Sequence, residues 1–339
     1  MAYKLISQLA HAEIFSPKPD ETLWFFTDLM GLHETDREGQ SVYLRAWQDP
    51  FHHSLKITEG PHPGLGHAAF RTDGAQELED AAKRLEAAGV EGRWIDGDLG
   101  HGRAYQAWMP GGHLFELFWD VDRYEAPAEL KSVYPNRPQR RTDHGAGVNR
   151  IDHVTVMSGC LMDDVELIRD QLGMRFTEAS REGDHVFFAT LTAASSNHDY
   201  AILSEIPGDE TAKPGRYNHI SWFLDSREDE LRANDLLVEH GFKLDYGPVR
   251  HGIGEHFSSY LYEPGGNYVE LQANGYWNDQ PDWETAYWET KQGGNNGWQI
   301  SQFSMQQSPP PEVANWQSGS ASPSQQYTAR ERENDQVRT

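Results

Sequence analysis

Two segments, one near residue 115 and one near residue 270, share a pattern that decides the fold. Glu263–Gln272 reads EPGGNYVELQ, and Met109–Trp119 reads MPGGHLFELFW. Each has a Pro-Gly-Gly turn followed by apolar residues in alternation around one glutamate, which is typical of a turn leading into a half-buried strand. Since the same turn and strand occur twice, the chain contains an internal repeat.

The segments that precede these two turns repeat in the same order. Leu9–Ile14 (LAHAEI) resembles Arg150–Val156 (RIDHVTV), and Gly64–Phe70 (GLGHAAF) resembles Arg216–Trp222 (RYNHISW). The separation between matching residues grows slightly along the chain, as gene duplication followed by short loop insertions would leave it. The chain is therefore predicted to consist of two similar halves.

Each half divides again into two units. Residues 75–89 and 227–241 have apolar positions at a spacing of three and four, which predicts helices, and Gly89 is expected at the C-terminal cap of the first. A strand precedes each helix, and short strands are expected after it, around Trp94, Tyr105 and Leu114 in one half and around Leu244, Tyr260 and Val269 in the other. The predicted fold class is α+β, with four βαβββ modules in two tandem domains.

Composition marks the domain boundaries. A Pro- and Arg-containing stretch with little apolar periodicity predicts a linker, and Gln, Ser, Asn and Pro dominate the end of the chain, which predicts a tail without its own core. We predict an N-terminal domain at 1–135, a linker at 136–148, a C-terminal domain at 149–290 and a tail at 291–339. Trp298, Phe303 and Trp316 suggest that part of the tail packs onto the body.

Composition and charge exclude several function classes. A formal net charge of −24 over 339 residues argues against nucleic-acid binding, which needs concentrated Lys and Arg. A single cysteine, Cys160, excludes an internal disulfide and fits a reducing compartment. Because no window approaches the roughly 18 apolar residues of a membrane span, we expect a cytoplasmic protein that binds no membrane.

Three residues of the second half form a candidate metal site. His153 and His219 stand in apolar-alternating strands, and Glu270 stands between Val269 and Leu271 in a third. A carboxylate in such surroundings is costly to bury unless it is paired or binds a metal. Two histidines and one carboxylate leave three coordination positions open, which is the facial triad of non-haem Fe(II) oxygenases.

A longer run, HGIGEHFSSYLYEPGGNYVEL from His251 to Leu271, carries a family resemblance. A glycine follows His251, Tyr260 lies nine residues after that histidine, and Glu270 lies ten further on. In this respect the sequence resembles the type I extradiol ring-cleavage dioxygenases of the vicinal-oxygen-chelate superfamily, and within them the catechol 2,3-dioxygenases. The resemblance covers roughly Gln8 to Asn278.

The resemblance implies a fold, a reaction and a site. It implies two vicinal-oxygen-chelate domains whose modules form two open β-barrels, in a homo-oligomer. It implies Fe(II), or Mn(II) in a minority of members, at His153, His219 and Glu270, with His198, His251 and Tyr260 as catalytic residues beside the metal. O₂ would then open a catechol ring to a 2-hydroxymuconic semialdehyde. The alternatives within the superfamily are a glyoxalase-like isomerase and a drug-binding protein that needs no metal.

The residues near His251 in the sequence indicate which type of catechol the protein would accept. Relatives that act on carboxylate-bearing catechols hold the carboxylate with arginines, whereas the position five before His251 is Tyr246 here. The early tail offers Lys291, Asn295 and Asn296 but no arginine. The sequence therefore favours a neutral alkyl- or aryl-substituted catechol.

The first half repeats the metal-ligand pattern. His11, His67 and Glu116 match the three ligand positions, His52 and His101 match His198 and His251, and Gln106 stands where Tyr260 does. Arg71 lies four residues after His67 and is expected on the same strand face, where its guanidinium could pair with Glu116. We therefore predict an N-terminal cluster that is structural and metal-free.

Overall fold

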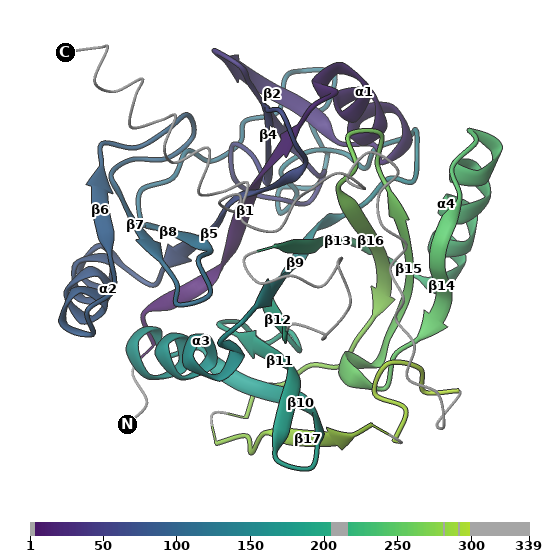
Figure 1. Cartoon of the computed structure of the whole chain (residues 1–339). Helices are drawn as coiled ribbons and strands as arrows, with labels where there is room; N and C mark the ends of the chain where they lie inside the picture. Colours follow the sequence, from purple (N-terminus) through teal and green to yellow (C-terminus); the bar gives the residue numbers. More distant parts are fainter. Residues whose placement is uncertain (1–3, 205–215, 281, 291, 299–339) are drawn as a thin grey trace.

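The computed structural model describes residues 4–204, 216–280, 282–290 and 292–298. Within these residues four βαβββ modules follow one another, two in each half of the chain (Figure 1). The first half consists of β1 (Ile6–Ser16), α1 (Pro19–Trp24), β2 (His33–Glu38), β3 (Ser41–Arg45), β4 (Leu55–Glu59), β5 (Gly64–Thr72), α2 (Ala75–Ala87), β6 (Gly92–Ile95), β7 (Ala104–Trp108) and β8 (Leu114–Phe118).

The second half repeats the same succession and adds one strand. It consists of β9 (Arg150–Ser158), α3 (Leu161–Leu167), β10 (Arg175–Glu182), β11 (His185–Thr192), β12 (Tyr200–Ser204), β13 (Tyr217–Leu224), α4 (Arg227–Glu239), β14 (Leu244–Arg250), β15 (His256–Tyr262), β16 (Tyr268–Asn274) and β17 (Ala286–Glu289). Two π-helical turns, Phe25–Leu29 and Ile168–Leu172, extend α1 and α3, and Ile253–Glu255 forms a 3₁₀ turn.

Each half forms one mixed sheet with the same internal order. The strands run β2-β3-β4-β1-β5-β8-β7-β6 in the first sheet and β14-β15-β16-β13-β9-β12-β11-β10-β17 in the second. At the centre of each sheet the first strands of two modules pair antiparallel, β1 with β5 and β9 with β13. Both sheets keep two edge strands and stay open, as predicted for open barrels.

This topology places the matching residues of the two halves on three neighbouring strands. The order β1-β5-β8 in one sheet corresponds to β9-β13-β16 in the other. Glu116 pairs with Ala69, two residues after His67, and Glu270 pairs with Ser221, two residues after His219. The sequence repeat is therefore a repeat of strand register.

The helices lie over the sheets and bury one face each. Figure 1 shows α4 alongside β14, β15 and β16 at the outer side of the second half. The buried positions of α2 are Leu78, Ala81, Ala82 and Leu85. Gly89 follows the end of α2 with φ +78, in the left-handed region that favours glycine, so its predicted capping role is confirmed.

The segment after β16 returns to the C-terminal sheet. β17 pairs in parallel with β10, and residues 292–298 lie near β14 and β15, where the Trp298 ring is 6.0 Å from the Phe257 ring. The tail residues Phe303 and Trp316 lie outside the described residues. None of the helices in the described part of the chain has the length and apolar character needed to cross a membrane.

Candidate metal centre

The structure brings together His153, His219 and Glu270 in the middle of the second sheet. The two Nε2 atoms are 3.1 Å apart. Oε2 of Glu270 lies 3.0 Å from Nε2 of His153 and 3.3 Å from Nε2 of His219. All three side chains are buried, and Oε2 accepts no hydrogen bond of normal geometry from the described residues. Two nitrogens and one unpartnered carboxylate oxygen thus face a common point.

The two histidines are oriented from behind by the residues that precede them. Nδ1 of His153 lies 3.0 Å from Oδ2 of Asp152, and Nδ1 of His219 lies 2.6 Å from Oδ1 of Asn218. Both Nδ1–H groups can donate to these oxygens, which leaves the Nε2 lone pairs directed at the common point. This arrangement, in which an outer oxygen fixes the tautomer of a ligating imidazole, is usual at protein metal sites. The donor set therefore fits one divalent transition-metal ion.

The protonation equilibria of the cluster are strongly coupled. Burial by itself would raise the pKa of Glu270, but the adjacent His153 and His219 outweigh burial and hold that pKa well below its usual range. Burial would lower the pKa of His153, but Glu270 and Asp152 raise it to about 9. A cation bound at the common point would take the place of that proton, so metal binding and proton release are linked here.

His198 lies against His153, one of the three residues of the cluster. Its ring is 4.1 Å from the ring of His153, and its Nδ1 contacts Oδ1 of Asn197. The amide nitrogen of Asn197 donates to Glu178 at 2.6 Å, so the amide oxygen faces His198 and accepts its Nδ1–H. Nε2 of a neutral His198 then carries a lone pair. Burial and the neighbouring His153 lower the pKa of His198 well below its usual value.

His251 and Tyr260 form a chain that ends on Glu270. Tyr260 donates to Oε1 of Glu270 at 2.6 Å, and its hydroxyl oxygen lies 2.9 Å from Nε2 of His251. On the other side, Nδ1 of His251 contacts the backbone carbonyl of Asn295. The single Tyr260 proton can serve either the carboxylate or a neutral imidazole, so these groups share one mobile proton.

His256 is a buried residue of this site that the sequence interpretation missed. Its ring lies 5.2 Å from His198 and 6.3 Å from His153, and burial lowers its pKa to about 4. It stands four residues before Tyr260 on β15, so both side chains lie on the same face of that strand. That spacing within HGIGEHFSSY was the available signal.

The first half contains a second cluster of the same kind. Nε2 of His11 and Nε2 of His67 are 3.0 Å apart, and Oε1 of Glu116 lies 3.7 and 3.8 Å from them. All three residues are buried. The expected partner Arg71 is absent from this cluster, since it donates to the backbone carbonyl of Trp119 and its guanidinium lies 4.2 Å over the Trp119 ring. The predicted Arg71–Glu116 pair is therefore wrong.

Two further histidines of the first half are placed differently from their predicted counterparts in the second. The residue against His11 is His53, whose ring is 4.3 Å away, and not His52 as the sequence comparison suggested. His53 precedes β4 by two residues as His198 precedes β12, so the match was wrong by one position. His101 lies directly on Glu116, with Nε2 3.1 Å from Oε1, whereas His251 contacts Tyr260.

Comparison with known proteins agrees with this architecture. The model of the glyoxalase/bleomycin resistance protein/dioxygenase superfamily matches residues 8–117 and 150–271. The chain is 38% identical over 293 residues to a metapyrocatechase of Geobacillus stearothermophilus, covering 86% of this chain and 88% of that protein. It is 34% identical to a manganese-dependent 2,3-dihydroxybiphenyl 1,2-dioxygenase of Geobacillus genomosp. 3, covering 84% and 90%.

A solved structure shows the same fold. The 2,3-dioxygenase LapB from Pseudomonas sp. KL28 superimposes with a TM-score of 0.77 at 26% identity, covering 84% of this chain and 98% of that one. The chain belongs to the glyoxalase/bleomycin resistance protein/dioxygenase superfamily, and within it to the extradiol ring-cleavage dioxygenases. The predicted family and α+β fold class are confirmed.

Proposed function

We propose that this chain opens the ring of a catechol by extradiol cleavage with O₂, at a metal held by His153, His219 and Glu270. The observation that carries the proposal is the buried Glu270 oxygen, which faces two imidazole nitrogens. Polar side chains of the same half, such as His251 and Tyr260, lie beside it. The names of the metapyrocatechase and dihydroxybiphenyl dioxygenase relatives support the same reaction.

We propose Fe(II) as the metal, because two histidines and one carboxylate with open positions are the ligand set of non-haem Fe(II) oxygenases. When bound, such an ion supplies adjacent positions for both catechol oxygens and for O₂. The manganese-dependent relative makes Mn(II) the alternative. Reconstitution of the metal-free protein with each ion alone distinguishes them, and higher turnover with Mn(II) would overturn the choice of iron.

The residues of the chain manage the protons of the substrate. A catechol hydroxyl placed beside Tyr260 can pass its proton toward His251 through the 2.9 Å contact between the phenol oxygen and Nε2. His251 is held in place by the carbonyl of Asn295, which fixes the direction of its ring. These two residues would bind the substrate asymmetrically, with one oxygen held as an anion.

His198 would act on the opposite side of the substrate. Since Asn197 accepts its Nδ1–H, the Nε2 lone pair is the free basic group on this side of the cluster. His198 can accept a proton there, and the resulting imidazolium can stabilise developing negative charge and return the proton later. Loss of one positioned acid–base group typically costs 10²–10⁴-fold in rate.

We propose a substrate with a neutral alkyl or aryl substituent. Tyr246 lies beside the two residues that would bind the substrate, with its ring 6.4 Å from that of His251 and 5.8 Å from that of Tyr260, and it accepts a hydrogen bond from Asn295 at 3.3 Å. Arg250, which directly precedes His251, pairs with Glu255 at 3.4 Å. An unpaired carboxylate buried there would cost several kcal/mol, since the loss of hydration of the ion would not be compensated.

An oxygen-electrode assay tests the function and the substrate together. With catechol, 3-methylcatechol, 2,3-dihydroxybiphenyl and homoprotocatechuate side by side, oxygen uptake should be stoichiometric with substrate loss. We expect kcat/KM to be higher for 3-methylcatechol or 2,3-dihydroxybiphenyl than for homoprotocatechuate. No oxygen uptake with any catechol would refute the function, whereas a reversed ranking would refute only the substituent.

A further inference from the structure

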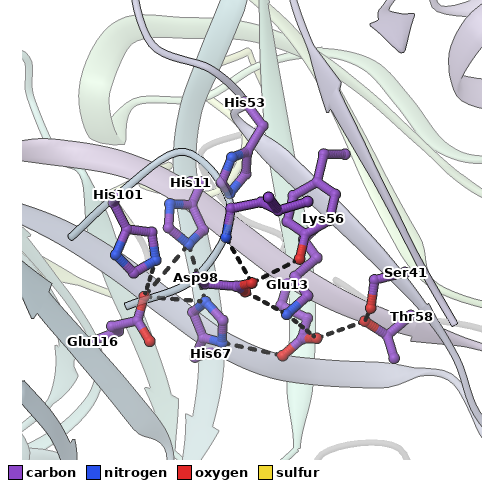
Figure 2. A network of polar contacts seen from close by, with 12 residues as sticks. His11, Glu13, Ser41, His53, Lys56, Thr58, His67, Asp98, His101 and Glu116 are labelled. Carbon is purple, nitrogen blue, oxygen red and sulfur yellow. Dashed lines mark hydrogen bonds and ion pairs between the residues drawn. The ribbon is translucent and has the colours of Figure 1, made fainter. Parts of the chain in front are cut away.

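We propose that the N-terminal cluster of His11, His67 and Glu116 binds a second divalent transition-metal ion, which has a structural role. This departs from the metal-free cluster predicted from the sequence, because that prediction depended on Arg71 pairing with Glu116, whereas Arg71 packs on Trp119. Figure 2 shows the three side chains pointing toward one another, with His53 and His101 beside them. The inference does not rest on the proposed function, because it concerns a different sheet and different ligands. Its chemical class follows from two imidazoles and one carboxylate, which suit Zn²⁺, Fe²⁺ and Mn²⁺.

The first argument is that the two clusters present the same donors in a similar arrangement, although the carboxylate oxygen is 3.7 and 3.8 Å from the nitrogens in the first half and 3.0 and 3.3 Å in the second. The two imidazole nitrogens are separated by 3.0 Å in the first half and 3.1 Å in the second. In each cluster one oxygen of the buried glutamate, Oε1 of Glu116 or Oε2 of Glu270, faces both nitrogens and accepts no hydrogen bond of normal geometry from the described residues. Whatever ion fits the second cluster therefore finds the same donors in the first.

The second argument is the direction of the lone pairs. Nδ1 of His67 lies 3.1 Å from Oε2 of Glu13, so the Nδ1–H donates to this carboxylate and Nε2 of a neutral His67 carries a lone pair. Nδ1 of His101 lies 2.9 Å from the Gly102 carbonyl, so its Nε2 also carries a lone pair, 3.1 Å from Oε1 of Glu116. Lone pairs facing one another at this distance require a cation or a proton between them.

The third argument is that the nearby cations are already engaged. Arg71 packs on Trp119, as described above. Lys56 is buried, but its Nζ lies 2.6 Å from Asp98 and 3.4 Å from Glu13, and Figure 2 shows it between these two carboxylates. The alternative occupant is a proton on the imidazoles.

The surroundings of this site favour a structural ion over a catalytic one. Gln106 replaces the tyrosine, donates to Oε2 of Glu116 at 2.7 Å and is itself held by Arg93. The Phe118 ring stacks on His101 at 4.7 Å. The space beside His11, His101 and Phe118 is almost completely filled by side chains, which leaves no room for a small-molecule substrate.

Metal analysis of four proteins tests the proposal. Wild type, Glu116→Ala, Glu270→Ala and the double variant are made metal-free, incubated with excess Mn(II) or Zn(II) alone, desalted and analysed for metal per chain. We expect about two ions in wild type, one in each single variant and none in the double variant, from the one triad per half. One ion in wild type, one in Glu116→Ala and none in Glu270→Ala would mean that the N-terminal cluster holds only a proton, and would overturn the proposal.

Two more variants and a melting-temperature measurement distinguish loss of the metal from loss of the fold. If Glu116→Ala does not fold, His67→Asn replaces it, because the amide keeps a polar group near Glu13. Gln106→Ala is the matched control, since it removes a contact to Glu116 but no ligand and should keep two ions. In Glu270→Ala, which keeps only the N-terminal triad, added Zn(II) should raise the Tm, and an unchanged Tm would contradict a structural ion. A Glu270→Ala protein with the same metal content as wild type would refute the C-terminal site and leave this one intact.

Discussion

The two halves of this chain place the same triad on the same three strands, yet surround it differently. Beside the second triad stand His198, His251 and Tyr260, with a hydrogen-bonded chain that leads to the backbone of Asn295. Beside the first, Gln106 takes the tyrosine position and Phe118 stacks on His101. The sheet thus determines where metal ligands can stand, and the next layer of side chains determines whether a substrate can reach them.

The two halves also differ in the oxygen atoms that contact the Nδ1 atoms of their histidines. In the second half, Asp152, Asn197 and Asn218 each precede a histidine of the site and offer its Nδ1 an oxygen. In the first half the residues before His11 and His67 are Ala10 and Gly66, and only His67 has such a partner, Glu13. The imidazoles of the second half, where we propose that the reaction occurs, therefore have more partners that fix their orientation than those of the first half.

The largest difference between the halves is expected on removal of the carboxylates. Glu270→Ala should lower kcat by more than the ~10²–10³-fold loss caused by deleting one stabilising donor, because two neutral histidines hold a metal poorly. Glu116→Ala removes the equivalent group 154 residues earlier in the repeat and should cost far less activity. Steady-state oxygen uptake at saturating catechol measures both. Equal losses in the two variants would show that the halves share one function.

A smaller loss is expected from the aromatic neighbours of the triads. His198→Phe should lower kcat about 10²–10⁴-fold, because it removes an acid–base group, while the metal content stays at the wild-type value. His53→Phe is the matched change, since His53 lies against His11 as His198 lies against His153. A His198→Phe enzyme with wild-type kcat, or one purified without its C-terminal metal, would contradict the role given to His198.

The repeat allowed most of this arrangement to be predicted, and its failures have physical causes. Both triads, the α2 and α4 helices and the Gln106–Tyr260 match follow from apolar periodicity and strand alternation. Arg71 was misplaced because strand spacing fixes the face of the sheet and not the side-chain conformation: β5 and β8 pair regularly, but the guanidinium turns to the carbonyl and ring of Trp119 beyond the end of β8. His52 was chosen in place of His53 because the sequence offers two adjacent histidines. Only the distance of each from the start of β4 shows which one corresponds to His198.

His256 and the π-helical turns show a second limit of the sequence. His256 is buried by contacts from other strands, and its distance from His198 depends on how β15 lies relative to β12. The π-helical ends of α1 and α3 arise where Phe25–Leu29 and Ile168–Leu172 pack into the core, so tertiary contacts set their hydrogen bonding. Local pattern contains neither piece of information.

The contact between Asp152 and Nδ1 of His153 allows a test of how much such orienting oxygens contribute to metal binding. Asp152→Ala should weaken metal binding at the C-terminal site by about 10–100-fold, the usual cost of removing an oxygen behind a ligating imidazole. Asp152→Asn keeps a carbonyl oxygen toward Nδ1 and should recover much of the affinity. Competition of the protein with a chelator for Mn(II) gives both values. If the two variants bind equally weakly, the charge of Asp152 matters and its geometry does not.

The helices carry one more difference between the halves. The buried face of α2 is Leu78, Ala81, Ala82 and Leu85, whereas that of α4 is Glu230, Ala233, Asn234 and Leu237. Glu230 and Asn234 therefore replace Leu78 and Ala82. Both contact Ser259 on β15, which donates to Glu230 at 2.8 Å and accepts from Asn234 at the same distance. A small polar network thus takes the place of an apolar contact beneath the sheet of the second half.

This network should make the stability of the protein depend on pH. Burial raises the pKa of Glu230 to about 9, whereas a glutamate in the unfolded chain has a pKa near 4.5. Above pH 4.5 the unfolded chain releases this proton while the folded protein keeps it, so the free energy of unfolding falls as pH rises until about pH 9, by up to ~1.4 kcal/mol per pH unit. Glu230→Gln carries no such proton and should lose less stability between pH 7 and pH 8. Urea unfolding of both proteins at the two pH values, compared as differences so that titration of the metal ligands cancels, measures the effect, and parallel pH dependences would show that Glu230 is ionised in the folded protein.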